Sequence, residues 1–261
     1  MNITYKDPGY AHSIESILLF LTGDEAPFWS DPILYFYPQI DKLALAGRNP
    51  SDKKQYLYDA FGGIYENLKA ELDNKVTCYN THFQTNKGQI EDALSDAFDL
   101  DARSIFNDLT GNVTMNPICP RFLKERYFDI FYKSSQQGAL GLSLHEVIHY
   151  FWFHVWNGHF GDHYDEYESP SLKWILSEMV VEAIMGDKRL SSLNPYFPRE
   201  NGGCVYPYFQ NMLVDGAPVL ETINRLYQDN KITDFMEISY VYCAKHENSI
   251  RQHIEMAENA R

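Results

Sequence analysis

The sequence has few cysteines and little positive charge, and each shortage argues against a class of protein. Four cysteines, Cys78, Cys119, Cys204 and Cys243, show no CxxC spacing, so we expect reduced thiols, with neither a disulfide framework nor a cysteine zinc site. The 22 basic residues stand against 36 acidic ones, which gives a net charge of −14. This balance disfavours nucleic-acid binding and favours neutral or cationic partners.

Long apolar runs are missing as well. No segment approaches the roughly 18 to 20 apolar residues that a transmembrane helix needs. The apolar run 17–21 lacks the basic flank and cleavage site of an export signal. We therefore expect a cytoplasmic protein with no membrane partner. Apolar side chains are nevertheless abundant, since 44% of the residues are hydrophobic and 19 are Tyr and 16 Phe, which predicts a substantial core and excludes a disordered chain.

Apolar spacing divides the chain near residue 110. Helical periodicity, interrupted by turns with Pro or Gly, predicts a helical region over 1–110, with separate helices at 13–21, 54–72 and 89–98. The remainder, 111–261, opens with a predicted strand.

The strand is expected at 127–133, which is rich in aromatic residues, and the preceding Pro117 and Pro120 favour a position at the sheet edge. Helices are then expected at 138–156, at 169–186 with Ser169 as N-cap and Gly186 as stop, and at 209–229 and 231–258. The prediction is a mostly helical α+β fold with a small sheet.

The segment "LSLHEVIHYFWF" carries the motif that most directly indicates chemistry. His145 and His149 are four positions apart, so on a helix both imidazoles lie on one face and can bind one metal ion. Glu146 then stands beside the ion, where it can take a proton from a water whose pKa the metal lowers. The spacing predicts a zinc-dependent hydrolase, against the alternative of a polar patch on a half-buried helix.

A catalytic zinc site usually has a third protein ligand. The apolar helix "WILSEMVVEAI" offers Glu178 and Glu182, which are again four positions apart on one face. One carboxylate can bind the metal while the other accepts the second ring N–H of a histidine ligand. An unpaired carboxylate in such a helix would be costly to bury, which favours a paired or metal-bound role for each.

"HEVIH" followed by a Trp-Ile-Leu-Ser-Glu-x-x-x-Glu helix resembles the gluzincin metallopeptidases over roughly residues 127–186. The resemblance implies that His145, His149 and Glu178 bind Zn2+, that Glu146 is the general base and that Glu182 supports the ligands from outside. It also implies a gluzincin-like core in which the strand at 127–133 pairs with a peptide or protein substrate at the sheet edge.

The sequence departs from the aminopeptidase branch of that family, because it lacks Gly-x-Met-Glu-Asn and has Ser177 before Glu178. It is similar instead to a separate, bacterial branch in which exopeptidase specificity is not implied. Candidates for the donor that stabilises an oxyanion are Tyr206, Tyr208 and His246, weighed against packing roles.

The alternative function is a binding or regulatory protein with a structural, closed zinc site. In that case His154, His163 or Glu182 would complete a shell of four protein ligands. The metzincin pattern is broken after His149, so His159 and His163 are expected in a loop. The acidic run 162–169 is interpreted as a solvated loop, with a cation site as the alternative.

Overall fold

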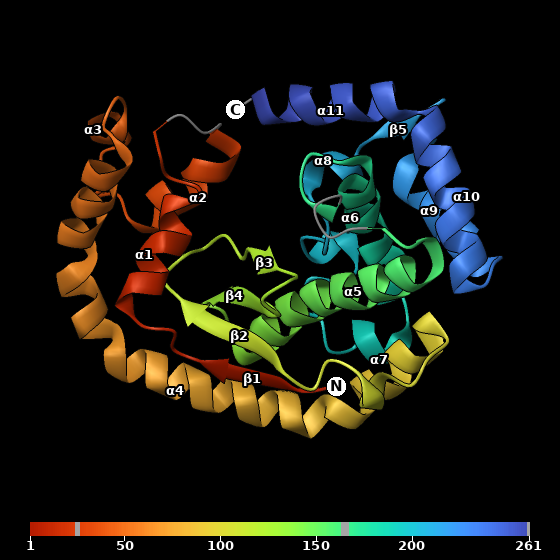
Figure 1. Ribbon diagram of the computed structural model, residues 1–261, viewed down its shortest axis with the longest axis horizontal. Coiled ribbons are helices and arrows are strands. Elements are labelled where there is room, and N and C mark those ends of the chain that lie inside the picture. Colours follow the sequence, from red (N-terminus) through yellow and green to blue (C-terminus); the bar gives the residue numbers. More distant parts are fainter. Residues whose placement is uncertain (24–26, 163–166, 260–261) are drawn as a thin grey trace. The chain divides into compact units, whose positions relative to one another are not determined.

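The computed structural model describes residues 1–23, 27–162 and 167–259. The fold is mostly helical with a small mixed sheet, which confirms the α+β prediction at this level (Figure 1). The chain forms two compact units, each described separately below. The sheet unit contains Asn2–Gln84 and Asp108–Ala139, and the helical unit contains Thr85–Asn107 and Leu140–Ala257. The expected division near residue 110 lies close to one of the points where the chain passes between them.

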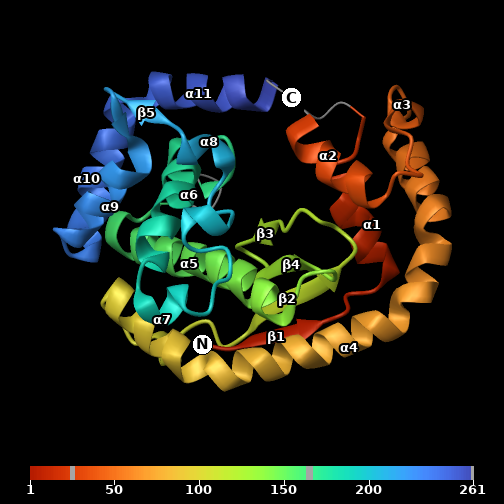
Figure 2. The same cartoon turned by 180° about the vertical axis from the view of Figure 1, so that it is seen from behind.

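The sheet unit is built on four strands in the order β1-β2-β4-β3 (Figure 2). These strands are β1 (Ile3–Lys6), β2 (Leu109–Thr114), β3 (Arg121–Phe122) and β4 (Tyr127–Phe131). β2 pairs in parallel with both β1 and β4, whereas β3 is antiparallel to β4. Gly111 lets the strands pack closely, because a Cβ there would lie 2.6 Å from the ring of Tyr5.

The predicted strand at 127–133 is present as β4, but the expectation that it forms the sheet edge is wrong. The backbone N–H of Asp129 donates to the carbonyl of Pro120, and β3 covers Tyr127 and Phe128. The chain's own 120–122 segment therefore occupies the position that a substrate strand would need along 127–129. Pro117 and Pro120 lie in the segment that precedes the edge strand β3, and β4 is an inner strand of the sheet.

Helices α1 (Tyr10–Leu18), α2 (Pro27–Phe36) and α3 (Lys42–Leu45) belong to the sheet unit, and they are followed by α4 (Pro50–Phe98). The prediction of separate helices at 54–72 and 89–98 is wrong, since α4 is continuous over 49 residues. Glycines 62, 63 and 88 weaken a helix without ending it, and no proline follows Pro50 within it. Most of its buried apolar residues recur at intervals of four or seven and form one stripe: Leu57, Phe61, Tyr65, Leu72, Tyr79, Phe83, Ile90, Leu94 and Phe98.

A polar cluster is buried between α1 and the sheet. Asp129 is 0% exposed, and its carboxylate accepts from the hydroxyl of Ser16 and lies 2.9 Å from Nε2 of His12. Asn112, the partner of Asp129 in the β2–β4 register, donates to the same carboxylate over 3.3 Å. Because a buried carboxylate needs partners, this cluster attaches α1 to the strands.

The helical unit is organised around α5 (Gln136–Phe160) and α6 (Leu172–Met185). Both helices are buried around most of their circumference in the middle, as expected for helices that are apolar on all sides. Ser171, rather than the predicted Ser169, is the N-cap of α6, because its side chain accepts from the backbone N–H of Trp174. The helix ends at Gly186 as predicted.

Further helices and a short hairpin complete the helical unit. They are η1 (Ala102–Ser104), α7 (Lys188–Ser191), η3 (Arg199–Asn201), α8 (Pro207–Gln210), the hairpin β5 (Leu213–Val214) and β6 (Ala217–Pro218), α9 (Val219–Gln228), α10 (Ile232–Lys245) and α11 (Glu247–Asn259). The expected helix at 209–229 is thus broken by a hairpin, whose turn contains Gly216 at φ 78°. α6 packs against α9 and α10 (Figure 1). None of the described helices has the length and apolarity needed to cross a bilayer.

Candidate metal centre

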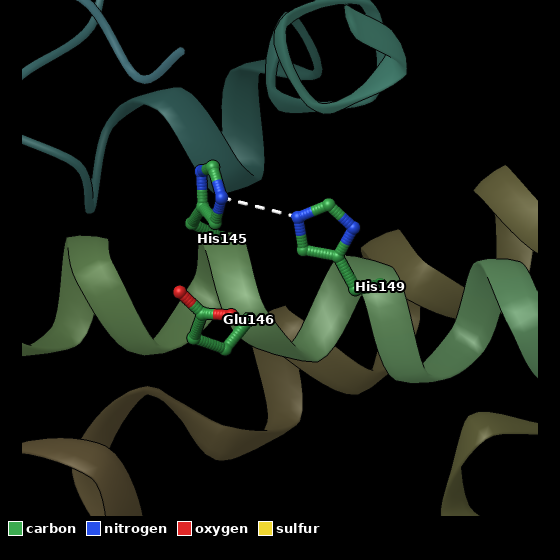
Figure 3. Close-up of side chains that lie close together, drawn as sticks. All are labelled: His145, Glu146 and His149. Atoms are coloured by element: carbon green, nitrogen blue, oxygen red, sulfur yellow. Dashed lines mark hydrogen bonds between the residues drawn. The ribbon is translucent and has the colours of Figure 1, made fainter. Parts of the chain in front are cut away.

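The site lies within the helical unit, where α5 and α6 face each other with polar side chains in an apolar surrounding. His149 is 0% exposed, Glu178 is 2% exposed and Glu146 is 6% exposed. Figure 3 shows the imidazoles of His145 and His149 turned toward each other on α5, with Glu146 next to His145. The helical spacing of four residues produces this pairing, because one turn separates the two side chains.

Three groups from the two helices converge on one point. The Nε2 atoms of His145 and His149 are 3.1 Å apart. The Glu178 carboxylate places Oε2 at 3.3 Å from Nε2 of His145 and Oε1 at 3.4 Å from Nε2 of His149. The ligand atoms of His145, Glu146 and His149 lie within 4.8 Å of one another.

These separations fit a single tetrahedral metal ion. With metal–ligand distances of about 2.0–2.1 Å, two ligands of a tetrahedron are separated by roughly 3.3–3.4 Å. The three observed distances of 3.1, 3.3 and 3.4 Å surround that value. Two imidazoles and one carboxylate are also a ligand set that tetrahedral metal sites use. The arrangement therefore fits a metal ion bound by His145, His149 and Glu178.

The hydrogen bond made by Nδ1 of His145 leaves Nε2 of the same ring as the nitrogen that can bind a metal. Its Nδ1 lies 2.7 Å from the backbone carbonyl oxygen of Cys204. A carbonyl can only accept, so Nδ1 carries the proton and donates it, and Nε2 of the neutral ring keeps its lone pair. That lone pair points toward Nε2 of His149 and the carboxylate of Glu178, which lie 3.1 and 3.3 Å from it. A neutral His149 ring donates from one nitrogen and accepts at the other, so its Nε2 can donate to these acceptors or use its lone pair for a metal ion. A proton or a metal ion at this point can therefore be shared by all three groups.

The electrostatics of Glu178 reflect the same convergence. Burial by itself raises the pKa of this carboxyl group, but the charges and hydrogen bonds of His149 and His145 outweigh it and hold the pKa well below its ordinary value. Glu178 is therefore an anion that requires a positive partner. Protonated imidazoles can supply that charge, and a divalent cation can replace them.

Glu182, predicted to support the ligands from outside, is held by Arg199. The Nε of Arg199 lies 2.8 and 2.9 Å from the two carboxylate oxygens, and Nη2 lies 2.6 Å from Oε1. The observed hydrogen-bond acceptor for His145 is instead the Cys204 carbonyl, which the sequence analysis missed. A backbone acceptor on a distant loop leaves no signal in residue type or spacing.

The further ligands considered for a closed site lie elsewhere or outside the described structure. His154 is exposed, and its ring contacts Phe106 at 5.5 Å between centroids. His163 lies outside the described residues, as do residues 164–166 of the acidic run 162–169 that was the alternative cation site. From that run, Asp162 accepts from the indole N–H of Trp156 and from Lys173. The predicted loop residue His159 is at the end of α5 and pairs with Glu237.

The three candidate oxyanion donors occupy different places. The ring of Tyr206 lies 6.1 Å from that of Trp174, one turn before Glu178 on α6, and it stacks on Tyr208 at 5.2 Å. Tyr208 is buried. His246 is at the C-cap of α10, where Nε2 lies 3.7 Å from Asp215 and the ring contacts Tyr242. Of the three, Tyr206 stands nearest in sequence to Cys204.

Comparison with known proteins finds no matching family model, no matching curated protein and no matching solved structure. The interpretation of the site therefore depends on its own residues and geometry.

Proposed function

We propose that this protein is a zinc-dependent hydrolase, with His145, His149 and Glu178 as metal ligands and Glu146 as general base. The observation that carries the proposal is the set of distances of 3.1 to 3.4 Å among three buried ligand groups that come from two helices. A polar patch on a helix surface would not bring a carboxylate from a second helix into the same buried position. The choice of zinc rests on the imidazole and carboxylate ligand set.

When bound, Zn2+ acts as a Lewis acid that polarises a substrate carbonyl and acidifies a water molecule. Glu146 is our proposed general base, and two observations support this: a carboxylate oxygen lies within 4.8 Å of a ring nitrogen of each histidine, and the side chain is almost completely buried. It accepts one proton from the attacking water and delivers it to the leaving amine as the C–N bond breaks. The oxygen of the water becomes part of the carboxylic acid product. Tyr206 is our candidate for a donor to the developing oxyanion, with His246 as the second choice.

We propose peptide bonds as the substrate class, on the resemblance of 127–186 to the gluzincins. The proposal includes a gluzincin-like arrangement of the two ligand helices. It excludes substrate pairing along residues 127–129 of β4, since residues 120–122 already occupy that edge. Substrate recognition must therefore use other surfaces than this part of the sheet.

The test is Glu146→Gln, which keeps the shape of the side chain but cannot accept the proton. We expect stoichiometric zinc, an unchanged far-UV circular dichroism spectrum, and loss of hydrolysis of a peptide library by a factor of about 10² or more. Glu237→Gln, at an exposed glutamate of α10, is the matched control and should retain full activity.

Hydrolysis at the wild-type rate by Glu146→Gln would exclude Glu146 as the base. If the wild-type protein binds one zinc ion but hydrolyses no member of the library, the alternative of a non-catalytic zinc protein is favoured. If the protein purified without chelators contains no zinc and does not take it up, the metal assignment itself is wrong.

A further inference from the structure

The loop between α7 and α8 contacts both helices that carry the proposed ligands. From this loop, the Cys204 carbonyl accepts from His145 on α5, and Arg199 forms a two-pronged ion pair with Glu182 on α6. Glu182 stands one turn after Glu178. A single segment, Arg199–Tyr206, thus contacts a histidine on one helix and the neighbour of the carboxylate on the other.

The backbone of this loop is fixed in a conformation that glycine favours. Gly202 and Gly203 have φ values of 117° and 81°. The N–H of Gly202 donates to the carbonyl of Arg199, and that of Gly203 donates to the carbonyl of Tyr196. The side-chain amide of Gln210 donates to the carbonyls of Gly202 and Val205, over 3.1 and 3.3 Å. These contacts hold the carbonyl of Cys204, which lies between them, in one orientation.

We infer that segment Arg199–Tyr206 is the positioning element of the metal centre, and that Glu182 acts on the site through Arg199 and this loop. The inference rests on the proposed function, because it concerns the affinity of the same three ligands for zinc. The carbonyl of Cys204 is the acceptor that keeps the His145 proton on Nδ1. The Arg199–Glu182 ion pair fixes the position of that carbonyl relative to α6. Outer groups of this kind typically change metal affinity by about 10- to 100-fold when they are removed.

The first test uses Gly203→Ala. A Cβ at this position would lie 2.3 Å from Nε2 of Gln210, so the amide must leave its two carbonyl partners, and the positive φ adds strain. We expect a roughly 10- to 100-fold weaker zinc Kd, measured by competition with a fluorescent chelator. Gly158→Ala is the matched control, since α5 has open space there. It should bind zinc like the wild type.

The second readout follows the proton on His145, which a general loss of stability would not move. In the zinc-loaded protein, long-range 1H–15N correlation spectra should show the Nδ1–H form of His145 in the wild type and in Gly158→Ala. The Gly203→Ala variant should show a changed Nδ1 shift, because its acceptor has moved. An unchanged shift and an unchanged Kd in a folded Gly203→Ala protein would overturn the inference.

The third test separates an indirect role of Glu182 from direct support of an imidazole. Zinc Kd values are measured for Arg199→Met, for Glu182→Gln and for the double variant. If Glu182 acts through Arg199, the two losses are not additive, and the double variant resembles the worse single one. Additive losses would show that Glu182 acts independently of Arg199 and would overturn that part of the inference. Absence of zinc binding in the wild type would refute the proposed function instead, so the two failures are distinguishable.

Discussion

The most informative perturbation compares the two glutamates of α6. Glu178 is 2% exposed and faces both imidazoles, whereas Glu182 is paired with Arg199. Glu178→Gln removes the only negative charge among the three proposed ligands from a site with almost no access to water. Removing one partner of a buried charge pair costs about 3–5 kcal/mol, which corresponds to a roughly 150- to 4,000-fold weaker Kd.

Glu182→Gln should have a smaller effect, of about 10- to 100-fold, because it changes an outer group and leaves the three ligands in place. The amide can still accept one hydrogen bond from Arg199, so the loop is loosened rather than released. The order of the two losses is therefore the prediction, with Glu178→Gln the more damaging by about tenfold or more.

The assay is zinc titration against a chelator of known affinity at neutral pH, supported by thermal melts of the metal-free proteins. The melts check that both variants are folded before zinc is added. A larger loss for Glu182→Gln would reverse the roles of the two residues. Equal and negligible losses would refute the assignment of Glu178 as the third ligand, because a zinc site that tolerates both changes does not use α6.

Three further predictions follow from the structure. His145→Ala and His149→Ala should each lose stoichiometric zinc, measured by elemental analysis after gel filtration, since each removes one of three ligands; zinc retained in either variant would contradict its assignment. The hydrogen bond with Asp129 raises the pKa of His12 despite the opposing effect of burial, so this pair should stabilise the fold fully below pH 6.5 and lose its contribution as pH rises through the raised pKa. His12→Gln should flatten this dependence in urea unfolding series between pH 6 and 9, and a wild-type profile as flat as that of the variant would argue against it. Gly141→Ala should lower the free energy of unfolding by about 1–3 kcal/mol, because its Cβ would lie 2.5 Å from Oδ1 of the buried Asn194. Gly63→Ala, which has open space around it in α4, should instead raise the free energy of unfolding by about 0.5–1 kcal/mol. Chemical denaturation measures both changes, and equal shifts would show that the contact at Gly141 relaxes without cost.

Residue spacing and composition predicted the helices and the strand that carry or precede the site. The apolar stretches around His145 and Glu178 indicated two helices, and both are present as α5 and α6. On each helix the interval of four residues decides which side chains share a face, so the sequence could already place His145 beside His149. The aromatic segment at 127–133 indicated a strand for the same reason, since alternation and composition are local properties.

Boundaries and edges were predicted less well, because they depend on neighbours. The continuity of α4 through its glycines is supported by a buried stripe along its whole length, which outweighs the small loss of helix propensity. Whether β4 is an edge strand depends on where residues 120–122 turn, and Pro117 and Pro120 do not determine that by themselves. The observed N-cap of α6 is Ser171 and not the predicted Ser169, because the cap hydrogen bond depends on backbone geometry as well as on residue type.

The sequence by itself supplied the candidate metal ligands, because HExxH on a helix places His145 and His149 on one face, and the following apolar helix offers Glu178 and Glu182. Only the tertiary structure decided how they are held. The approach of Glu178 to both imidazoles requires α6 to bring this residue against α5, and the residues that meet are about thirty positions apart in the sequence. The acceptor for His145 is the backbone carbonyl of Cys204, 59 residues away. Every residue has a carbonyl, so its position in space, which no residue type encodes, gives it this role.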